Sequence, residues 1–493
     1  MFSPFAKHTL RQIRLKCGKR MSEKTQSGSG EWSNGWPIVL ASLIGIMLCL
    51  SPLPYWALNV IGEELGKEFG WDRPTITAGF LYMTAGVLVS APIVGMLVDK
   101  IGARKVLLPS IVALGFGTMS FALMTPDPRV FYFIFFVTAV LGAGTLPITW
   151  TKSIVNNFDR FRGLALGIAL TGTGLYGFIA TPSIQFMVDQ FGWRTAYVSV
   201  GALPLLFSLP IAFFLFRDEK EQANLVTADK SGVGRLLIMG LGFAVALFTS
   251  MQIMTSAVGL VGVIVLMAVF LVAYLILVFM RSDQGNADIP GLTMGETMKN
   301  YRFWVIFFSF LLLGAVVSGI IANSKYILLD KGYSAQGATH LFMGAGVIGL
   351  ATLSGRLIGG WLVDHFWAPM IAFVFMSLPA VGCFILAGNM GVGMNVFALV
   401  LVGLAAGVEF DLMAYFVSRY FGTKSYALIY GLIYAAFGLG SGTSPIIFNI
   451  LRGGDEDYAN VLKLVAAGFV IGATLLLTLG KYRDFENGGH SKV

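Results

Sequence analysis

Long runs of apolar residues, almost free of charge, alternate with short polar loops along most of the chain. Crossing a hydrocarbon core of ~30 Å takes about 20 residues of α-helix. In lipid, each backbone polar group must be satisfied within its own segment, which favours such helices. The pattern predicts six spanning helices before a charged connector (37–61, 75–98, 106–124, 130–151, 163–187 and 195–216) and six after it (302–325, 337–362, 368–388, 393–417, 426–450 and 459–480).

A further uncharged run lies within the connector, from Leu236 to Met280. As a single helix it would be about 68 Å long, more than twice the thickness of the hydrocarbon core. We therefore expect it to fold back near Thr255 as two extra spans. The predicted fold is an all-α integral membrane protein with fourteen transmembrane helices in all. Its expected parts are a tail at 1–36, a six-helix domain at 37–216, the connector at 217–301 with extra helices at about 236–254 and 257–280, a second six-helix domain at 302–480 and a tail at 481–493.

The two halves of the chain carry matching landmarks. The sequence GMLVD, which ends at Asp99, nearly recurs as GWLVD, which ends at Asp364, 265 residues later. Pro182 and Pro445, each with a glycine five residues before it, give almost the same offset of 263 residues. We infer that a six-helix membrane unit has been duplicated.

Composition agrees with a membrane protein. Hydrophobic residues make up 56% of the chain and charged residues 12%, whereas soluble proteins carry about 25% charged residues. Most of the 34 Lys and Arg residues fall on one side when both termini are placed in the cytoplasm, which is the positive-inside pattern. We expect a multi-pass protein of the cell membrane with both termini cytoplasmic. The three cysteines are scattered and predict neither a disulfide framework nor a metal site.

The stretch GMLVDKIGARK, from Gly95 to Lys105, resembles the cytoplasmic loop signature of the major facilitator superfamily, G-x-L-x-D-R-x-G-R-R. The resemblance implies two six-helix repeats with a substrate site between them. It also implies a gating role for Asp99 and Arg104. Asp99 can cap a helix start or pair with a base across the domain interface, which would hold the inner gate shut. The second copy keeps Asp364 but continues with HFW, so its half of this gate is predicted to be weaker.

A narrower resemblance begins at Asn157. The sequence NFDRFRGLALG leads into a glycine-rich segment that contains Pro182 and ends in GWR at Arg194, and YGLIYAAFG follows from Tyr430. These stretches are similar to the monocarboxylate and oxalate:formate porter branch of the superfamily. The resemblance implies a carrier for small organic carboxylates.

In that branch an arginine in helix eight binds the substrate carboxylate, and Arg356 falls at that position, where the first copy has Ala91. Arg356 lies about 12 Å along the helix from Asp364, close to the midplane. An arginine there costs at least ~2.5–3.5 kcal/mol, so we expect it to face a cavity and an anionic partner. Its planar fork suits a carboxylate; the alternative is a structural ion pair without a substrate role. The chain departs from the branch at Thr352, where animal-type members have aspartate, and at Phe437, where the oxalate carrier has lysine, so a monoanion is the expected substrate.

The predicted tenth helix supplies two acids, Glu409 and Asp411. Glu409 lies about 15 Å along the helix from Arg419 at the cytoplasmic edge, at nearly the depth of Arg356. The two acids lie roughly 200° apart around the helix, so they cannot face the cavity equally. We favour Glu409 as the proton-coupling acid that pairs with Arg356, with Asp411 as the alternative. Either acid can instead contact a helix end or Arg419.

Aromatic residues near the expected cavity are candidates to receive the organic part of the acid. Aromatic residues make up 13% of the chain, so most of them are expected to be packing or interfacial residues. Lys152, near the inner end of helix four, is expected to extend its amine to the cytoplasm. Besides Arg356, the substrate-binding candidates are Tyr55, Trp56, Tyr82, Trp150, Tyr430 and Tyr434.

The leading prediction is a secondary active transporter that moves small organic monocarboxylates by alternating access, through proton symport or anion exchange. Its expected partners are the carboxylate, protons and the lipid bilayer, and we expect it to function as a monomer. The sequence shows no catalytic triad, phosphate loop, nucleotide-binding domain or metal cluster, so we expect no enzyme, no cofactor and no nucleic-acid binding. One alternative is efflux of cationic or lipophilic drugs by proton antiport, which the membrane arginine opposes. A transporter-like sensor is the alternative of another class.

Overall fold

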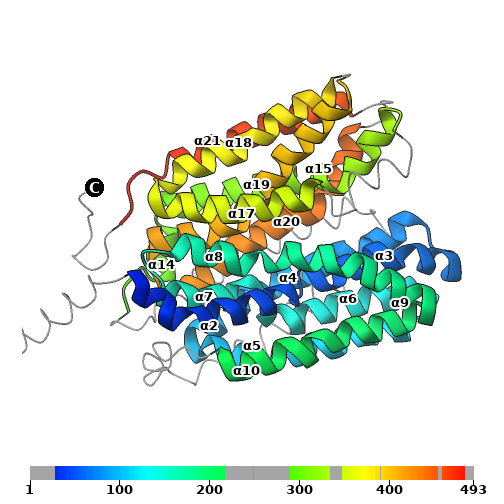
Figure 1. Ribbon diagram of the computed structural model, residues 1–493, viewed down its shortest axis with the longest axis horizontal. Helices are drawn as coiled ribbons and strands as arrows, with labels where there is room; N and C mark the ends of the chain where they lie inside the picture. The colour runs from blue at the N-terminus through cyan, green and yellow to red at the C-terminus, as the bar shows by residue number, and fades with distance from the viewer. Residues whose placement is uncertain are drawn as a thin grey trace, which may run out of the picture.

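The structure, a computed structural model, describes residues 28–216, 248, 289–333, 347–388, 390–452 and 458–483. These residues form a bundle of long helices (Figure 1). Eleven helices among them are long and apolar enough to cross a membrane, which confirms the prediction of an all-helical membrane fold. The two predicted extra spans, apart from Phe248, lie outside the described residues, so the total of fourteen helices stays a prediction.

The first half of the chain supplies one six-span unit, called here the N unit. Its short connecting turns are η1 (Ser120–Leu123), η2 (Ala143–Thr145) and the π-helical η3 (Pro204–Ser208). Its helices are α2 (Gly28–Met47), α3 (Pro52–Phe69), α4 (Arg73–Ile101), α5 (Ala103–Met119), α6 (Pro128–Gly142), α7 (Pro147–Asn157), α8 (Arg162–Leu170), α9 (Gly172–Leu203) and α10 (Leu209–Leu215).

Two of the predicted helices in the N unit are broken at prolines. Pro52 lacks a backbone N–H and therefore starts α3, leaving a break after α2. Pro147 starts α7 in the same way after a break that follows α6. The two breaks meet inside the bundle, where the buried backbone N–H of Leu50 donates to Thr145 Oγ1 at 3.0 Å. The hydroxyl oxygen of Thr145, in the second break, thus accepts the backbone N–H that the first break leaves without a helical partner.

The helical stretch Arg162–Leu215 has 54 residues, which would be about 81 Å as one straight helix. It turns back at Gly192, whose φ of 79° lies in the left-handed region that glycine adopts without strain. Figure 1 shows α8 and the first part of α9 running along the bundle and α10 returning. Counting this stretch twice, the described part of the N unit has six helical segments long enough to cross a membrane.

The second half of the chain supplies the C unit. Its helices agree with the predicted spans except that the first is longer than expected, reaching Asp330, and that the described part of the second begins only at Val347. They are α14 (Met294–Met298), α15 (Tyr301–Asp330), α17 (Val347–His365), α18 (Ala368–Ala387), α19 (Val392–Phe421), α20 (Tyr426–Arg452) and α21 (Ala459–Leu477).

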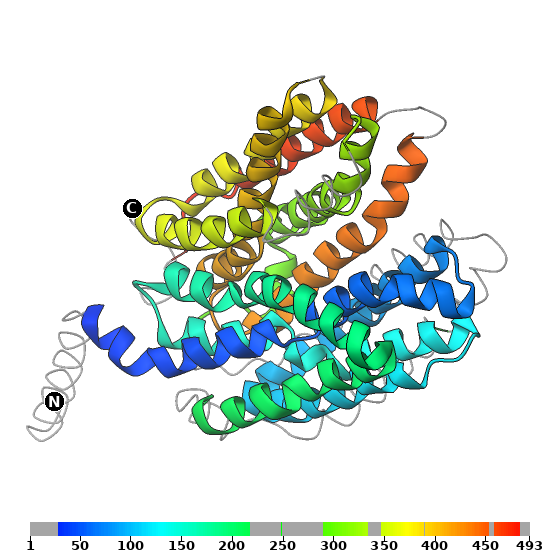
Figure 2. The same cartoon turned by 45° about the vertical axis from the view of Figure 1, so that its right-hand side comes forward.

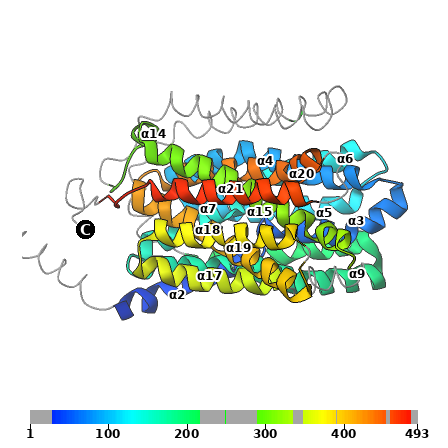
Figure 3. The same ribbon diagram turned by 90° about the horizontal axis from the view of Figure 1, so that it is seen from above.

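The N unit and the C unit lie side by side (Figure 2). They meet where α4 packs on α20 and where α8 packs on α17. The start of α2, α14 and the segment after α21 lie at one end of the bundle, which we call the terminal end (Figure 3). The end of α3 and the turn within α9 lie at the opposite end.

Candidate functional site

A buried ion pair lies inside the C unit. Arg356 on α17 and Asp411 on α19 are each only 2% exposed, and Arg356 Nη1 lies 3.4 Å from Asp411 Oδ1. The guanidinium also lies over the ring of Phe410, with its carbon 5.6 Å from the ring centroid. Glu409 is equally buried. The arginine therefore has the anionic partner that its burial requires.

The packing of α17 on α19 explains why Asp411 and not Glu409 forms the pair. The two helices approach closely at Gly403 and Gly407, where an added Cβ would lie 2.7 Å and 2.3 Å from backbone oxygens of α17. Asp411 follows these glycines by eight and four residues, so it shares their face. Glu409 instead shares a face with Ala398, whose carbonyl lies against α18. The expected pairing of Arg356 with Glu409 is not observed.

Several buried polar atoms around the pair have no hydrogen-bond partner among the residues that the structure describes. They are Arg356 Nε, Asp411 Oδ2, Glu409 Oε1 and the hydroxyl of Tyr430. Tyr430 and Tyr434 also lie near Arg356. Because buried polar groups are normally paired, this cluster marks the candidate substrate site. Among the described residues, no group of three or more His, Cys, Asp or Glu is placed so that it could hold a metal ion.

One wall of this site is aromatic and reaches the N unit. Phe410 packs against Phe437 and Tyr434, with ring centroids 4.9 Å and 5.8 Å away. Tyr434 also interacts with Ser51, in the break between α2 and α3. The sequence analysis did not single out Phe410 or Ser51. A Pro-x-Pro pair inside a predicted span is the signal that points to Ser51, because transporter sites lie at broken helices.

Tyr82 and Trp150, both predicted for the substrate site, pack within the N unit. Tyr82 stacks on Tyr132 of α6 with ring centroids 4.5 Å apart. Trp150 fills the space left by Gly45 of α2 and donates its indole N–H to the carbonyl of Thr145 at 3.0 Å. Both side chains are fully buried, and these contacts are those of packing residues.

Tyr55 and Trp56 on α3 are half-buried. Tyr55 lies against Phe80 of α4, with ring centroids 5.1 Å apart. Trp56 occupies the space that a side chain at Gly177 of α9 would need. Of the six aromatic candidates, Tyr430 and Tyr434 are the two that the structure brings to Arg356.

Asp99, at the end of α4, caps a helix of the other unit. Its carboxylate accepts the backbone N–H groups of Ala427 and Leu428, at 3.2 Å and 2.9 Å, at the start of α20. A negative charge is stabilised there by the helix dipole, as expected from the sequence. Lys152 completes the contact, with its amine 2.9 Å from the same carboxylate. Lys152 is 7% exposed, so the prediction that it extends to the surface is wrong.

Asp364, at the end of α17, makes the corresponding contact from the C unit to the N unit. It accepts the backbone N–H groups of Gly163 and Leu164, at 2.7 Å and 2.8 Å, at the start of α8. These distances are no longer than those at Asp99. The backbone hydrogen bonds of the second contact are thus as short as those of the first, and the expectation that this half of the gate is weaker stays a prediction.

The two contacts differ in the side chain beside the aspartate. Lys152 donates to the carbonyl of Val98 at 3.3 Å. In the C unit, the hydroxyl of Tyr415 donates to the corresponding carbonyl, that of Val363, at 2.8 Å. A neutral phenol thus takes the place of the ammonium group. Lys152 and Tyr415 are 263 residues apart, the same offset as between Pro182 and Pro445, so the sequence repeat is the signal that relates them.

Arg104, predicted to take part in gating, donates to the carbonyl of Phe213 at 2.6 Å and so holds α5 to α10 within the N unit. A different arginine joins the two units. Arg419 of α19 donates to the carboxylate of Asp159 at 3.0 Å and to its backbone carbonyl at 2.9 Å. Arg162 also pairs with Asp159, at 3.3 Å. These residues, like both aspartate caps, belong to the terminal end.

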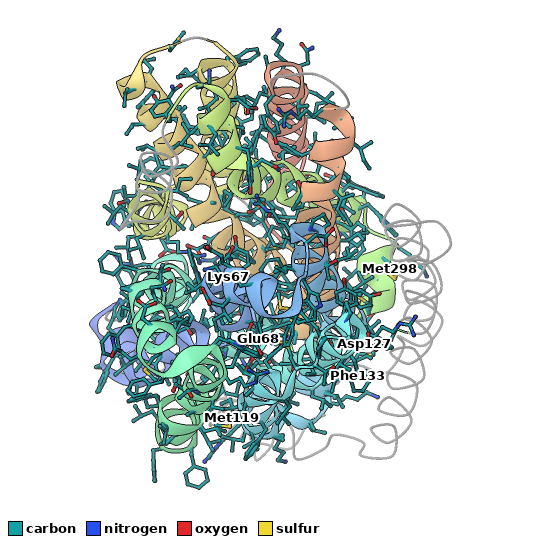
Figure 4. All side chains as sticks on the ribbon, turned by 90° about the vertical axis from the view of Figure 1, so that its right-hand side faces the viewer. Lys67, Glu68, Met119, Asp127, Phe133 and Met298 are labelled. Atoms are coloured by element: carbon teal, nitrogen blue, oxygen red, sulfur yellow. The ribbon has the colours of Figure 1, made fainter. Side chains whose placement is uncertain are left out.

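The opposite end, which faces the viewer in Figure 4 with Glu68 labelled, has its own contacts. Glu68 at the end of α3 accepts hydrogen bonds from Trp193 and, at 2.8 Å, from Arg194, the two residues that follow the turn at Gly192. Arg73 at the start of α4 lies 4.1 Å above the ring of Tyr326 of α15, a cation–π contact between the units. The GWR motif therefore fixes α3 to α9, and Arg73 provides a contact across the interface.

The chain matches the family model of the Major Facilitator Superfamily over residues 44–237 and 232–445. These two matches cover most of the chain, so the protein belongs to the Major Facilitator Superfamily. It is a multi-pass membrane transporter. The family resemblance stated from the sequence is confirmed.

Its curated relatives are named as monocarboxylate transporters. The chain is 28% identical over 179 residues to monocarboxylate transporter 14 of Mus musculus, a match that covers 36% of this chain and 33% of the relative. It is 35% identical over 190 residues to monocarboxylate transporter 9 of Pongo abelii, covering 37% and 35%. It is 22% identical over 470 residues to monocarboxylate transporter 11 of Homo sapiens, covering 92% and 83%. The matches thus span about a third of transporters 14 and 9 and most of transporter 11.

Solved structures of the superfamily share the fold. A proton:xylose symporter matches with a TM-score of 0.65 and 12% identity, over 91% of this chain and 96% of that chain. The human organic anion transporter MFSD10 matches with a TM-score of 0.61 and 13% identity, over 92% and 100%. At these identities the matches show the fold alone.

Proposed function

We propose that this transporter carries small organic monocarboxylate anions across the cell membrane by alternating access, with both chain termini in the cytoplasm. The observation that carries the proposal is the buried Arg356–Asp411 pair with unpartnered polar atoms around it. The names of the curated relatives support the same substrate class. We take the predicted helices at 236–280 to be an accessory pair outside the two six-helix domains.

Arg356 is the proposed carboxylate-binding residue. Its Nη1 faces Asp411, whereas its Nε has no hydrogen-bond partner in the described structure. The planar fork therefore retains a donor for a substrate carboxylate. Phe410, which lies beside the guanidinium, and Phe437, which packs on Phe410, would contact the apolar part of the acid. One guanidinium balances the charge of one carboxylate, which favours a monoanion.

Asp411 is the first candidate for proton coupling and Glu409 is the second. A substrate carboxylate at Arg356 competes with Asp411 for the guanidinium. An acid that loses its counter-ion in a buried site favours its protonated form. Proton and substrate would then cross together. If another anion occupies the site on the return step, the same residues support exchange.

Asp99 and Asp364 are the proposed gate at the terminal end. Opening this end requires both carboxylates to leave the helix starts that they cap, and Arg419 to leave Asp159. Opening the opposite end requires Arg73 to leave the C unit. Arg104 is not part of the proposed gate, because its contact lies within the N unit.

Transport by the purified protein in proteoliposomes tests the function. We expect uptake of labelled acids from a panel of acetate, lactate, pyruvate and benzoate, and greater uptake with an inward proton gradient if the mode is symport. Arg356→Lys keeps the charge but changes the geometry and should raise KM. Arg129→Lys, at an exposed arginine of the opposite end, is the matched control. Uptake of a lipophilic cation without uptake of any acid would contradict the proposal.

A further inference from the structure

A basic hollow lies at the terminal end of the C unit, away from Arg356. It lies between the start of α15 and the segment after α21 and has a volume of about 540 Å³. Four of its lining residues are basic, namely Lys299, Arg302, Lys481 and Arg483, and one, Glu296, is acidic. This excess of positive charge in a concave surface favours an anionic ligand.

The acidic residue of the hollow is already engaged. Thr293 donates its backbone N–H and its hydroxyl to Glu296, at 2.8 Å each, in the capping box that starts α14. These hydrogen bonds hold the pKa of Glu296 below its usual range. Asn300, also in the lining, has a buried side-chain NH₂ group without a partner in the described part of the chain. The positive charge of the hollow is therefore not balanced by a free carboxylate among its lining residues.

One of its arginines is held in place. Arg302 donates its Nε–H to the carbonyl of Leu479 at 2.8 Å and lies over the ring of Tyr420. The hydroxyl of the neighbouring Tyr301 donates to the carbonyl of Thr478 at 3.2 Å. These contacts fix the start of α15 to the end of α21, so the hollow is preformed.

The hollow lies at the border of two apolar spans. The apolar part of α15 starts at Tyr301, and that of α21 ends at Leu477. Tyr301 and Phe308 lie seven residues apart on one face of α15 and are 55% and 53% exposed. Exposed aromatic residues at such a border are typical of a lipid interface. An apolar strip thus leads from the basic hollow along the membrane-facing side of α15.

We propose that this hollow binds the phosphate-bearing headgroup of an anionic phospholipid, with an acyl chain along the exposed face of α15. Basic pockets at the ends of transmembrane helices suit such headgroups. A free phosphate shares the headgroup chemistry, but it cannot use the apolar strip. The inference is independent of the proposed substrate and of Arg356.

Native mass spectrometry of the purified full chain tests the site. We expect phosphatidylglycerol to bind more tightly than phosphatidylcholine. The Lys299→Gln/Lys481→Gln variant should weaken phosphatidylglycerol binding by about fivefold for each charge removed and leave phosphatidylcholine binding unchanged. Lys463→Gln removes one charge from α21 near its other end and should bind phosphatidylglycerol like the wild type. Arg483→Gln, an independent change in the same lining, should also weaken binding.

The soluble arm of the experiment uses inorganic phosphate and glycerol 1-phosphate as competitors. On the lipid proposal, neither displaces phosphatidylglycerol at comparable concentration. If either compound displaces phosphatidylglycerol at comparable concentration, this is a site for soluble anions and the proposal is overturned. Unchanged phosphatidylglycerol affinity in both lining variants, or an equal loss in Lys463→Gln, would overturn it as well.

Discussion

The two units of this transporter make matching contacts at the terminal end and different ones deeper in the bundle. Asp99 and Asp364 each accept two backbone N–H groups at the start of a helix in the other unit. Eight residues before each aspartate the side chains differ, with Ala91 in the N unit and Arg356 in the C unit. On the proposed function, the gate between the two units needs contacts from both, whereas one substrate carboxylate needs a single cation.

The backbones at these two positions are packed alike. An added Cβ on Gly431 would lie 2.6 Å from the carbonyl oxygen of Ala91, and one on Gly167 would lie 2.7 Å from that of Arg356. The difference therefore lies in the side chains. Arg356 reaches Asp411 within its own unit. The corresponding stretch of the N unit, 145–148, contains no ionisable residue.

Removing the charge that distinguishes the units should have the largest effect. We expect Arg356→Ala to lower kcat/KM for acid uptake at least ~100-fold, since a bidentate charged contact with the substrate is lost. The measurement is initial uptake in proteoliposomes, corrected for the amount of protein incorporated. Arg129→Ala should transport like the wild type. Normal acid uptake by Arg356→Ala would remove this residue from the site.

Neutralising the acid partner should separate exchange from proton-driven accumulation. Asp411→Asn imitates the protonated acid, so exchange of labelled substrate should continue while accumulation driven by a pH gradient is lost. Glu409→Gln should retain accumulation, because Glu409 is not paired with Arg356. Both variants are compared in the same vesicles with and without the gradient. The reverse result would transfer coupling to Glu409, the preference derived from the sequence.

Replacing each of the two capping aspartates should lower the stability of the protein by a different amount. Asp99→Asn leaves the buried Lys152 without its ion pair, a loss of about 3–5 kcal/mol. Asp364→Asn weakens two hydrogen bonds and should cost about 1–3 kcal/mol. In thermal melts, Asp99→Asn should therefore have the lower Tm, and adding Lys152→Gln should recover part of the loss. Equal Tm values for the two single variants would show that Lys152 contributes nothing.

Replacing residues 236–280 with a polar linker should have the smallest effect. In sequence the segment falls between the two predicted six-helix domains, and it contains no Asp, Glu, Lys, Arg or His. We expect some transport to remain once uptake is normalised to protein in the membrane. Complete loss in a correctly inserted, stable variant would show that the segment takes part in the mechanism.

Most of the fold could be predicted because membrane helices leave a direct signal in the sequence. The lengths of the apolar runs predicted the spanning helices. The recurrence of GMLVD as GWLVD pointed to the two related contacts. The helix breaks before Pro52 and Pro147 were missed. Both breaks lie in apolar runs without charge. Only the packing shows that Leu50 donates a hydrogen bond to Thr145 there.

The candidate site could be predicted only in part. A buried arginine is unusual enough to single out Arg356, but the choice between two acids depends on which face of α19 meets α17. That face is determined by Gly403 and Gly407, which allow the close approach. Lys152 was misjudged for a related reason, since its partner Asp99 lies on another helix.

Proton uptake on substrate binding tests the central claim most directly. Purified transporter in weakly buffered solution is mixed with a saturating monocarboxylate, and the pH change is converted to protons bound per protein. The account predicts uptake of about one proton by the wild type and none by Asp411→Asn, with binding itself lost in Arg356→Ala. Substrate binding by the wild type without proton uptake, or unchanged uptake in Asp411→Asn, would contradict it.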